Sequence, residues 1–265
     1  NILYSSYFDY FLSIDSYFIT LLISLIIGVG LLFLGQKSEK RINFIEQLIL
    51  IIFVYFLTSI LIALPFYLSN YQVTFINSLF ESISGITGTG FSIFKNIKYL
   101  DPTLILWRSS SQWIGGLYFL FFLIIIFSNK QFNFKMNDLT FSGDGSINSE
   151  SNIKNLLLKI FIIYCLLSFF IFLLLNITEV RLFNSLNLSM SLISAGGFMP
   201  TDSLNQVIQS NSQKIVFIFS LFLSMLNFFL ILNIFDKKVF IRDHKEDLFL
   251  ILLSIILILL VYFNN

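Results

Sequence analysis

The chain has 265 residues, of which 57% are hydrophobic, and a mean hydropathy of +0.87. Several runs of about 18 or more apolar residues with few charges are typical of a helical membrane protein rather than a soluble domain. The formal net charge of +1 gives nucleic-acid binding no electrostatic support, and the single cysteine, Cys165, excludes an internal disulfide or a cysteine-based metal site.

The first predicted crossing covers Tyr17 to Leu34, and the aromatic stretch from Asn1 to Ser16 before it is too short to span a bilayer. A basic connector at 36–41 leads to a second crossing, from Ile42 to Phe66. We expect that helix to break at Pro65, because proline disrupts a helix interior. The chain starts without methionine and stops inside an apolar run, which indicates a piece of a longer protein.

A short amphipathic run from Thr74 to Ile86 follows, and the third crossing is Leu104 to Phe127. A helix of that length reaches about 20 Å, well short of a hydrocarbon core of about 30 Å. The run ends in Thr87-Gly88-Thr89-Gly90, and irregular backbone at membrane depth is tolerated only beside a polar cavity or buried in protein. The pattern predicts a half-helix that dips into the membrane and ends in an ion-selectivity loop.

The same layout recurs after a polar connector at 128–152, and such repetition indicates tandem units. A fourth crossing is followed by a short segment, by the loop Ser194-Ala195-Gly196-Gly197, by a fifth crossing, and by the start of a sixth apolar run at Leu248. The ranges are Ile153–Leu175, Val180–Ile193 and Ile215–Phe235. We align residues 79–82 with 182–185, and residues 89–91 with 196–198. The expected units are 1–41, 42–127, 128–152, 153–235 and 236–265.

Lysine and arginine placement predicts the orientation, because cytoplasmic loops carry an excess of these residues. With the connector at 36–41 taken as cytoplasmic, that side holds 11 of them and the other side holds 5, which places both glycine loops outside. The 11 are Lys37, Lys40, Arg41, Lys130, Lys135, Lys154, Lys159, Lys237, Lys238, Arg242 and Lys245. The 5 are Lys95, Lys98, Arg108, Arg181 and Lys214.

Backbone carbonyls can replace the hydration shell of a cation without adding net charge that would trap it. Glycine lets consecutive carbonyls point at one axis, and the C-terminal end of each half-helix carries partial negative charge. The predicted selectivity filter, for a cation, is Thr87, Gly88, Thr89, Gly90, Ser194, Ala195, Gly196 and Gly197. Close helix packing through small residues is the alternative for one such loop, but two copies favour a filter.

Other polar residues lie on otherwise apolar segments. Glu81 either attracts cations at the outer mouth or pairs with Arg108 as a structural brace, and we favour the brace. Interhelical hydrogen bonding is expected for Gln112, Asn187 and Asn227. Packing or interfacial anchoring is expected for Trp107, Trp113 and Tyr118, and His244 is expected in a solvated loop.

Several ordered motifs resemble the TrkH/Ktr/HKT superfamily of potassium transporters, most closely the bacterial TrkH type. They are Ala63-Leu64-Pro65-Phe66, residues 80–87 with Thr89-Gly90, Leu106-Trp107-Arg108-Ser109 with residues 112–116, residues 182–187 with 196–198, and Asn227-Phe228. The resemblance implies an all-α membrane protein in which four helix–pore loop–helix repeats surround a pseudo-fourfold pore. Two repeats are present here, so the resemblance implies the N-terminal half of a subunit, or a split protein that pairs with a second half.

The resemblance also implies one key glycine per filter loop, here Gly90 and Gly196. It implies potassium uptake across the cytoplasmic (inner) membrane, a homodimer of pore subunits, and cytoplasmic nucleotide-binding regulatory subunits of the TrkA type. Gly88 and Ala195 depart from the family, which usually has threonine at both positions. Sodium or mixed-cation transport, a secondary carrier with broken helices and a non-transporting scaffold remain alternatives. No nucleophile–base pair points to an enzyme, and no cofactor is expected.

Overall fold

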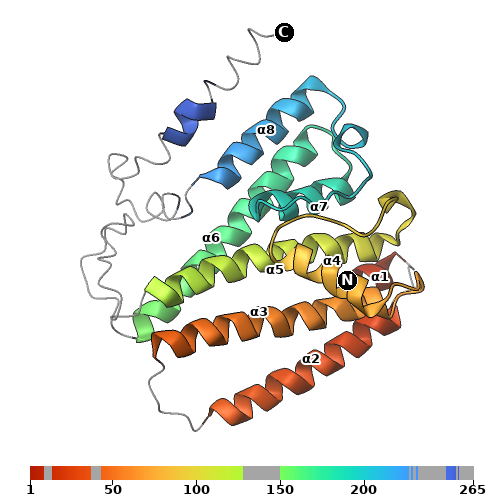
Figure 1. Ribbon diagram of the computed structural model, residues 1–265. Helices are drawn as coiled ribbons and strands as arrows, with labels where there is room; N and C mark the ends of the chain where they lie inside the picture. Colours follow the sequence, from red (N-terminus) through yellow and green to blue (C-terminus); the bar gives the residue numbers. More distant parts are fainter. Residues whose placement is uncertain are drawn as a thin grey trace.

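The computed structural model describes residues 1–8, 14–36, 43–127, 150–226, 228, 231, 249–254 and 256. All regular secondary structure in these residues is helical. Four helices are long and apolar enough to cross a membrane: α2 (Ile14–Gly35), α3 (Phe44–Tyr67), α5 (Pro102–Phe127) and α6 (Glu150–Ile177). The first four predicted crossings are therefore confirmed as helices. Figure 1 shows α2, α3 and α5 as successive layers, with α6 and α8 beyond α5.

The long helices are apolar on their outward faces. On α2, Ile26 and Phe33 are 72% and 70% exposed, and Tyr17 is one of the few buried residues. An aqueous surface would not carry such a continuous apolar face, but a bilayer stabilises it. The short helix α1 (Ile2–Tyr7) lies in the stretch that the sequence predicted to be too short to span.

Two predicted helix ends are wrong. Helix α3 continues through Pro65 to Tyr67, and Leu68 N still donates to Leu64 O at 2.8 Å. A proline so close to a helix end removes a single intrahelical hydrogen bond, so the final turn survives. Helix α8 (Asn211–Met225) begins before the predicted Ile215, because Ser210 and Gln213 form a capping box. It ends at Met225, and the predicted end of the fifth crossing at Phe235 lies outside the described residues. The described residues do not include Asn227, the connectors at 37–42 and 128–149, or the charged loop with His244, so the predictions for these segments are not tested.

The two short segments are the half-length helices α4 (Phe75–Ile86) and α7 (Leu182–Ile193), each of 12 residues. Thr74 caps α4 by accepting a hydrogen bond from Asn77 N. Both half-helices pack against α5, and each also packs against the long helix that precedes it, α3 or α6. Apolar clusters at these junctions form the core, while the buried polar residues gather around the half-helices.

Candidate ion-selectivity site

Helix α5 brings the ends of both half-helices close together through adjacent glycines. A Cβ atom on Gly115 would lie 2.0 Å from the carbonyl oxygen of Ile86, the last residue of α4. A Cβ atom on Gly116 would lie 2.8 Å from Cβ of Ser194, which follows α7. Real Cβ atoms do not approach other atoms so closely, so only glycine allows this packing. The Gly115-Gly116 pair therefore sets both loops against one helix.

The two half-helices repeat residue by residue, with Phe75 matching Leu182 and Ile86 matching Ile193. The identical pairs in this register include Asn77 with Asn184, Ser78 with Ser185, Leu79 with Leu186, Ser82 with Ser189, Ser84 with Ser191, and Gly90 with Gly197. The predicted pairing of residues 79–82 with 182–185 is thus wrong by one helical turn. Asn-Ser precedes Leu-Phe in α4 but follows it in α7, so the sequence can be aligned by either pair, and only the helix ends separate the two registers.

Hydrogen bonds establish the same register in the loops. Thr89 N donates to Ser84 O at 3.0 Å, and Gly196 N donates to Ser191 O at 2.8 Å. Gly196 is therefore the counterpart of Thr89. The predicted alignment of residues 89–91 with 196–198 is therefore confirmed, and the counterpart of Gly90 is Gly197, whereas the family resemblance implied Gly196 as the key glycine of the second loop.

The N–H groups of both loops turn back toward the half-helices. Gly88 N donates to Gly85 O at 3.0 Å, and its equivalent Ala195 N donates to Leu192 O at 2.9 Å. Gly88 and Ala195 both have positive φ, at 70° and 52°, and Gly90 has φ of 79°. This backbone uses the N–H groups to close each loop onto its half-helix.

The main-chain carbonyl oxygens of residues 87–90 and 194–197 accept no hydrogen bond from the described part of the chain. Thr87, Thr89, Ala195 and Gly197 are exposed on this chain, and backbone carbonyls at membrane depth are tolerated without partners only where they line a polar cavity. A set of unpaired carbonyls on two adjacent loops can instead supply oxygen ligands to a dehydrated cation. The side-chain oxygen of Thr87 is already used, since it donates to Ile83 O at 2.7 Å.

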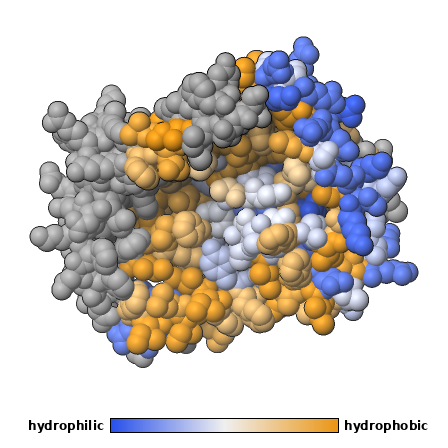
Figure 2. Space-filling model, turned by 45° about the horizontal axis from the view of Figure 1, so that its top comes forward, coloured by the Kyte–Doolittle hydropathy of each residue, from blue (hydrophilic) through white to orange (hydrophobic). Residues whose placement is uncertain are grey.

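The two loops touch each other. A Cβ atom on Gly90 would lie 2.6 Å from Gly197 Cα, and the position of a Cβ atom on Gly88 lies 3.6 Å from Ser194 O. Both loops are therefore on one side of the molecule, as a shared pore requires. Figure 2 shows a hollow face with a pale, weakly hydrophilic floor framed by hydrophobic side chains. A cavity of about 320 Å³ adjoins the second loop and is lined in part by Ser194, Ala195 and Tyr164.

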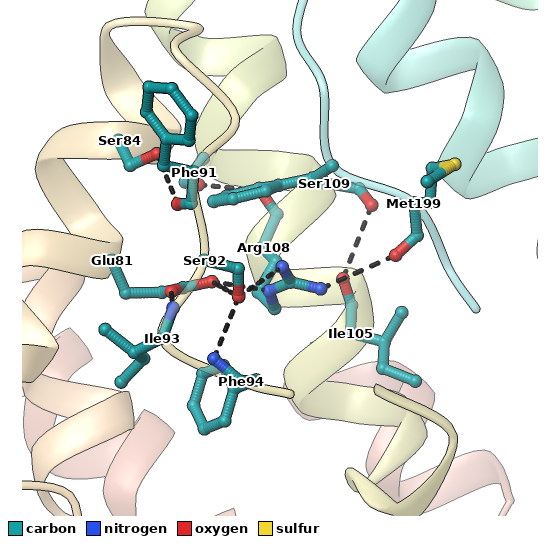
Figure 3. A network of polar contacts seen from close by, with 12 residues as sticks. Glu81, Ser84, Phe91, Ser92, Ile93, Phe94, Ile105, Arg108, Ser109 and Met199 are labelled. Carbon is teal, nitrogen blue, oxygen red and sulfur yellow. Dashed lines mark hydrogen bonds and ion pairs between the residues drawn. The ribbon is translucent and has the colours of Figure 1, made fainter. Parts of the chain in front are cut away.

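Glu81 and Arg108 form a buried ion pair beside the first loop. Arg108 Nε donates to Glu81 Oε1 at 2.7 Å, and the two side chains are 1% and 0% exposed. Glu81 also accepts hydrogen bonds from Ser92 Oγ at 3.0 Å and Ile93 N at 2.9 Å (Figure 3). A carboxylate with these three partners is satisfied within the protein. The geometry thus supports the brace over cation attraction at the mouth.

Gln112 lies one turn beyond Arg108 and supports the second loop. Its Oε1 accepts hydrogen bonds from Ser191 Oγ at 2.9 Å and from Phe198 N at 3.1 Å. The interhelical bond predicted for Gln112 is confirmed. The corresponding prediction for Asn187 is wrong, because its only hydrogen bond in the described residues is to Phe183 O, within α7.

The two tryptophans of α5 are packing groups that also tie helices together. Trp107 Nε1 donates to Ile62 O on α3 at 3.0 Å, and Trp113 Nε1 donates to Ser168 Oγ on α6 at 2.8 Å. Tyr118 packs edge-on against Tyr55. Helix α5 is therefore fixed on both sides, which holds its loop-facing residues in place.

Hydrogen bonds also join the segments that follow the two loops. Asp202, after the second loop, accepts a hydrogen bond from Ile97 N, after the first. Tyr71 accepts a hydrogen bond from Asp101 N at 2.6 Å, and partial burial raises the pKa of its phenol. Sequence reasoning did not identify Ser92, Phe198 and Asp202 as supporting residues. The spacing of Arg108 and Gln112, one helical turn apart on α5, is the signal that could have directed attention to the loop exits.

These features define a multi-pass helical membrane protein in which two half-length helices present adjoining glycine loops. The family model described as TrkH cation transport protein matches residues 13–264. The chain belongs to this family.

Individual relatives agree with the family match. The Trk system potassium uptake protein TrkG of Escherichia coli is 34% identical over 106 residues, which are 40% of this chain and 22% of that protein. The corresponding protein TrkH of Escherichia coli is 24% identical over 255 residues, 93% of this chain and 53% of that protein. The chain thus spans at most about half the length of these relatives.

A solved structure shares the fold. The potassium transporter TrkH from Vibrio parahaemolyticus superimposes with a TM-score of 0.61 at 19% sequence identity, over 85% of this chain and 51% of that chain. At this identity the match supports the helical architecture alone. The fold class predicted from the sequence is confirmed.

Proposed function

We propose that this chain supplies two of the four pore repeats of a potassium uptake transporter. The observation that carries the proposal is the pair of touching loops whose eight main-chain carbonyl oxygens accept no hydrogen bond in the described residues. Thr87, Gly88, Thr89, Ser194, Ala195 and Gly196 are the proposed K⁺ ligands, with Gly90 and Gly197 completing the filter. The ion is cargo and passes between carbonyl groups, with no resident cofactor in the step.

Electrostatics support a neutral filter. The buried carboxylate nearest the first loop is paired with Arg108, so the brace adds no net charge that would hold a cation in place. The partial negative ends of α4 and α7 both lie at the loops and favour a cation there without a full charge. Potassium is the proposed ion because relatives are named as potassium uptake proteins.

The proposed assembly extends beyond the two repeats. Two further repeats would complete the ring, whether they come from the same gene product or from a second polypeptide. We further propose that the protein lies in the cytoplasmic (inner) membrane and that its pore subunits form a homodimer. Cytoplasmic nucleotide-binding subunits of the TrkA type would regulate it. The lysine and arginine asymmetry supports an outward orientation of both loops.

Ion selectivity of a glycine variant tests the proposal. Gly90→Ser would place a side chain against the Gly197 backbone at a residue with φ of 79°, so we expect lower K⁺ over Na⁺ selectivity in proteoliposomes containing the complete protein. Gly30→Ser on α2 is the matched control, because a Cβ atom there meets nothing within 4 Å. Absence of K⁺ flux in the complete wild-type assembly, or equal selectivity in Gly90→Ser and wild type, would contradict the proposal.

A further inference from the structure

A single guanidinium group contacts both filter loops. Besides its ion pair with Glu81, Arg108 donates from Nη2 to Ser92 Oγ at 3.0 Å and from Nη1 to Met199 O at 3.5 Å. In the shared register, Ser92 and Met199 are equivalent, because each follows the Gly-Phe pair of its loop. Figure 3 shows the Arg108 side chain between the first loop and Met199 on the second.

The second loop also packs on this group through an aromatic ring. The guanidinium carbon of Arg108 lies 4.2 Å from the ring centroid of Phe198, which is 2% exposed. A cation over an aromatic face is attracted by the ring, and the attraction grows when both groups are desolvated. Arg108 therefore has an ionic contact with α4, a polar contact with the exit of each loop and a cation–π contact with the second loop.

Arginine fits this position better than lysine would. Its planar group carries donors in fixed directions, so one side chain can satisfy a carboxylate, a hydroxyl and a carbonyl at once. Lysine retains the charge and can pair with Glu81, but its single ammonium cannot reproduce the three separated contacts and the stacked ring.

We propose that Arg108 is a positioning residue that couples the two filter loops, so that the geometry of the second loop depends on the half-helix and loop of the first repeat. This inference rests on the proposed function. It adds a specificity-determining residue outside the set of carbonyl ligands. Because the coupling uses the loop exits, we expect substitutions that keep the Glu81–Arg108 pair to alter ion selectivity.

The test measures the ratio of Rb⁺ flux to Na⁺ flux in proteoliposomes containing the complete protein. Arg108→Lys is expected to lower the ratio about tenfold, the scale of one lost charge-assisted hydrogen bond. Phe198→Leu and Ser92→Ala keep the Glu81–Arg108 pair and are each expected to lower it by a smaller factor. Phe91→Leu is the matched control: Phe91 is the equivalent of Phe198 but is 68% exposed, and we expect an unchanged ratio.

A double-mutant cycle examines the coupling itself. Combining Ser92→Ala with Phe198→Leu should change the flux ratio non-additively when Arg108 is present and additively in the Arg108→Lys background. Additive effects in both backgrounds, or an equal loss in Phe91→Leu, would overturn the inference. If Arg108→Lys does not fold, the cycle in the Arg108 background decides alone. Absent wild-type flux would instead refute the proposed function, whereas normal wild-type selectivity with an unaffected Arg108→Lys variant would refute only the coupling.

Discussion

The two glycine loops, which we propose form the filter, share a backbone register but differ in the residues that support them. Beside the first loop, Ser84 Oγ of α4 donates to Phe91 O at the loop exit at 2.6 Å, and the Phe91 ring is 68% exposed. In the second, the equivalent Ser191 Oγ donates to Gln112 on α5, and the Phe198 ring is buried against Arg108. The first loop is thus held by the Ser84 hydroxyl of its own half-helix, and the second is held by Gln112 and Arg108 of α5, a helix of the preceding repeat.

This difference shows how repeats within one chain can diverge without changing the half-helix and loop geometry. The equivalent N–H groups donate to equivalent carbonyls in both loops. The supporting side chains vary, because each loop has a different neighbour. Because the second loop depends on α5 of the first repeat, we expect the junction between repeats to be the part of the site most sensitive to substitution.

Removing one partner of the buried ion pair should have the largest effect. Arg108→Ala leaves the Glu81 carboxylate buried without its cation, and breaking such pairs costs about 3–5 kcal/mol. We expect a large loss of thermal stability of the purified protein in detergent, and disturbance of both loops. Lys95→Ala, an exposed cation after the first loop, serves as the control and should unfold at the wild-type temperature. Equal stability of the two variants would show that the pair does not support the fold.

Removing the Gln112 side chain that supports the second loop should lower thermal stability by a smaller amount. Gln112→Ala deprives Phe198 N and Ser191 Oγ of their shared acceptor, and each buried group left unpaired costs about 1–3 kcal/mol. Ser84→Ala removes one bond, to Phe91 O, from the first loop. The comparison predicts a lower midpoint of thermal unfolding for Gln112→Ala than for Ser84→Ala. The reverse order would mean that the first loop depends more on its single hydrogen bond than the second does on α5.

Exchanging glycine and alanine at the two equivalent positions with positive φ, Gly88 and Ala195, should have the smallest effect on thermal stability. Gly88→Ala places a side chain at φ of 70°, where an L residue loses about 1–2 kcal/mol, although the nearest atom to the new Cβ is 3.6 Å away. Ala195→Gly relieves the same strain in the second loop but adds unfolded-state entropy, so its net change should stay within about 1 kcal/mol. Differential scanning fluorimetry should therefore show destabilisation in Gly88→Ala alone. A clear loss of stability in Ala195→Gly would indicate that the Ala195 methyl group makes contacts that outweigh its strain.

Hydropathy and element length were sufficient to predict the long helices and both half-helices. The α4 and α7 segments were recognisable because they are too short to cross and end in glycine or small residues. The alignment of α4 with α7 could not be predicted, because Asn-Ser and Leu-Phe occur in both helices and allow two registers one turn apart. Only the helix ends decide between these registers. Pro65 shows a related limit: local propensity indicates a break, but the position of the residue near the helix end decides the outcome.

The support behind the loops could be predicted only in part. The Glu81–Arg108 pair was one of two alternatives, since an ionisable residue among apolar ones needs a partner. That Arg108 also reaches Met199 and Phe198 depends on how α7 packs on α5, and this packing follows from the close approach at Gly116. Such contacts between residues far apart in the sequence require the tertiary structure.

We propose that main-chain oxygens of both loops coordinate the same alkali ion. The most direct test is a crystal structure of the complete protein in Rb⁺, with the ion located by its anomalous signal. We expect a peak between residues 87–90 and 194–197, within coordinating distance of carbonyl oxygens from each loop. A peak confined to the Glu81 carboxylate, or no peak at the loops in a protein that transports Rb⁺, would contradict it.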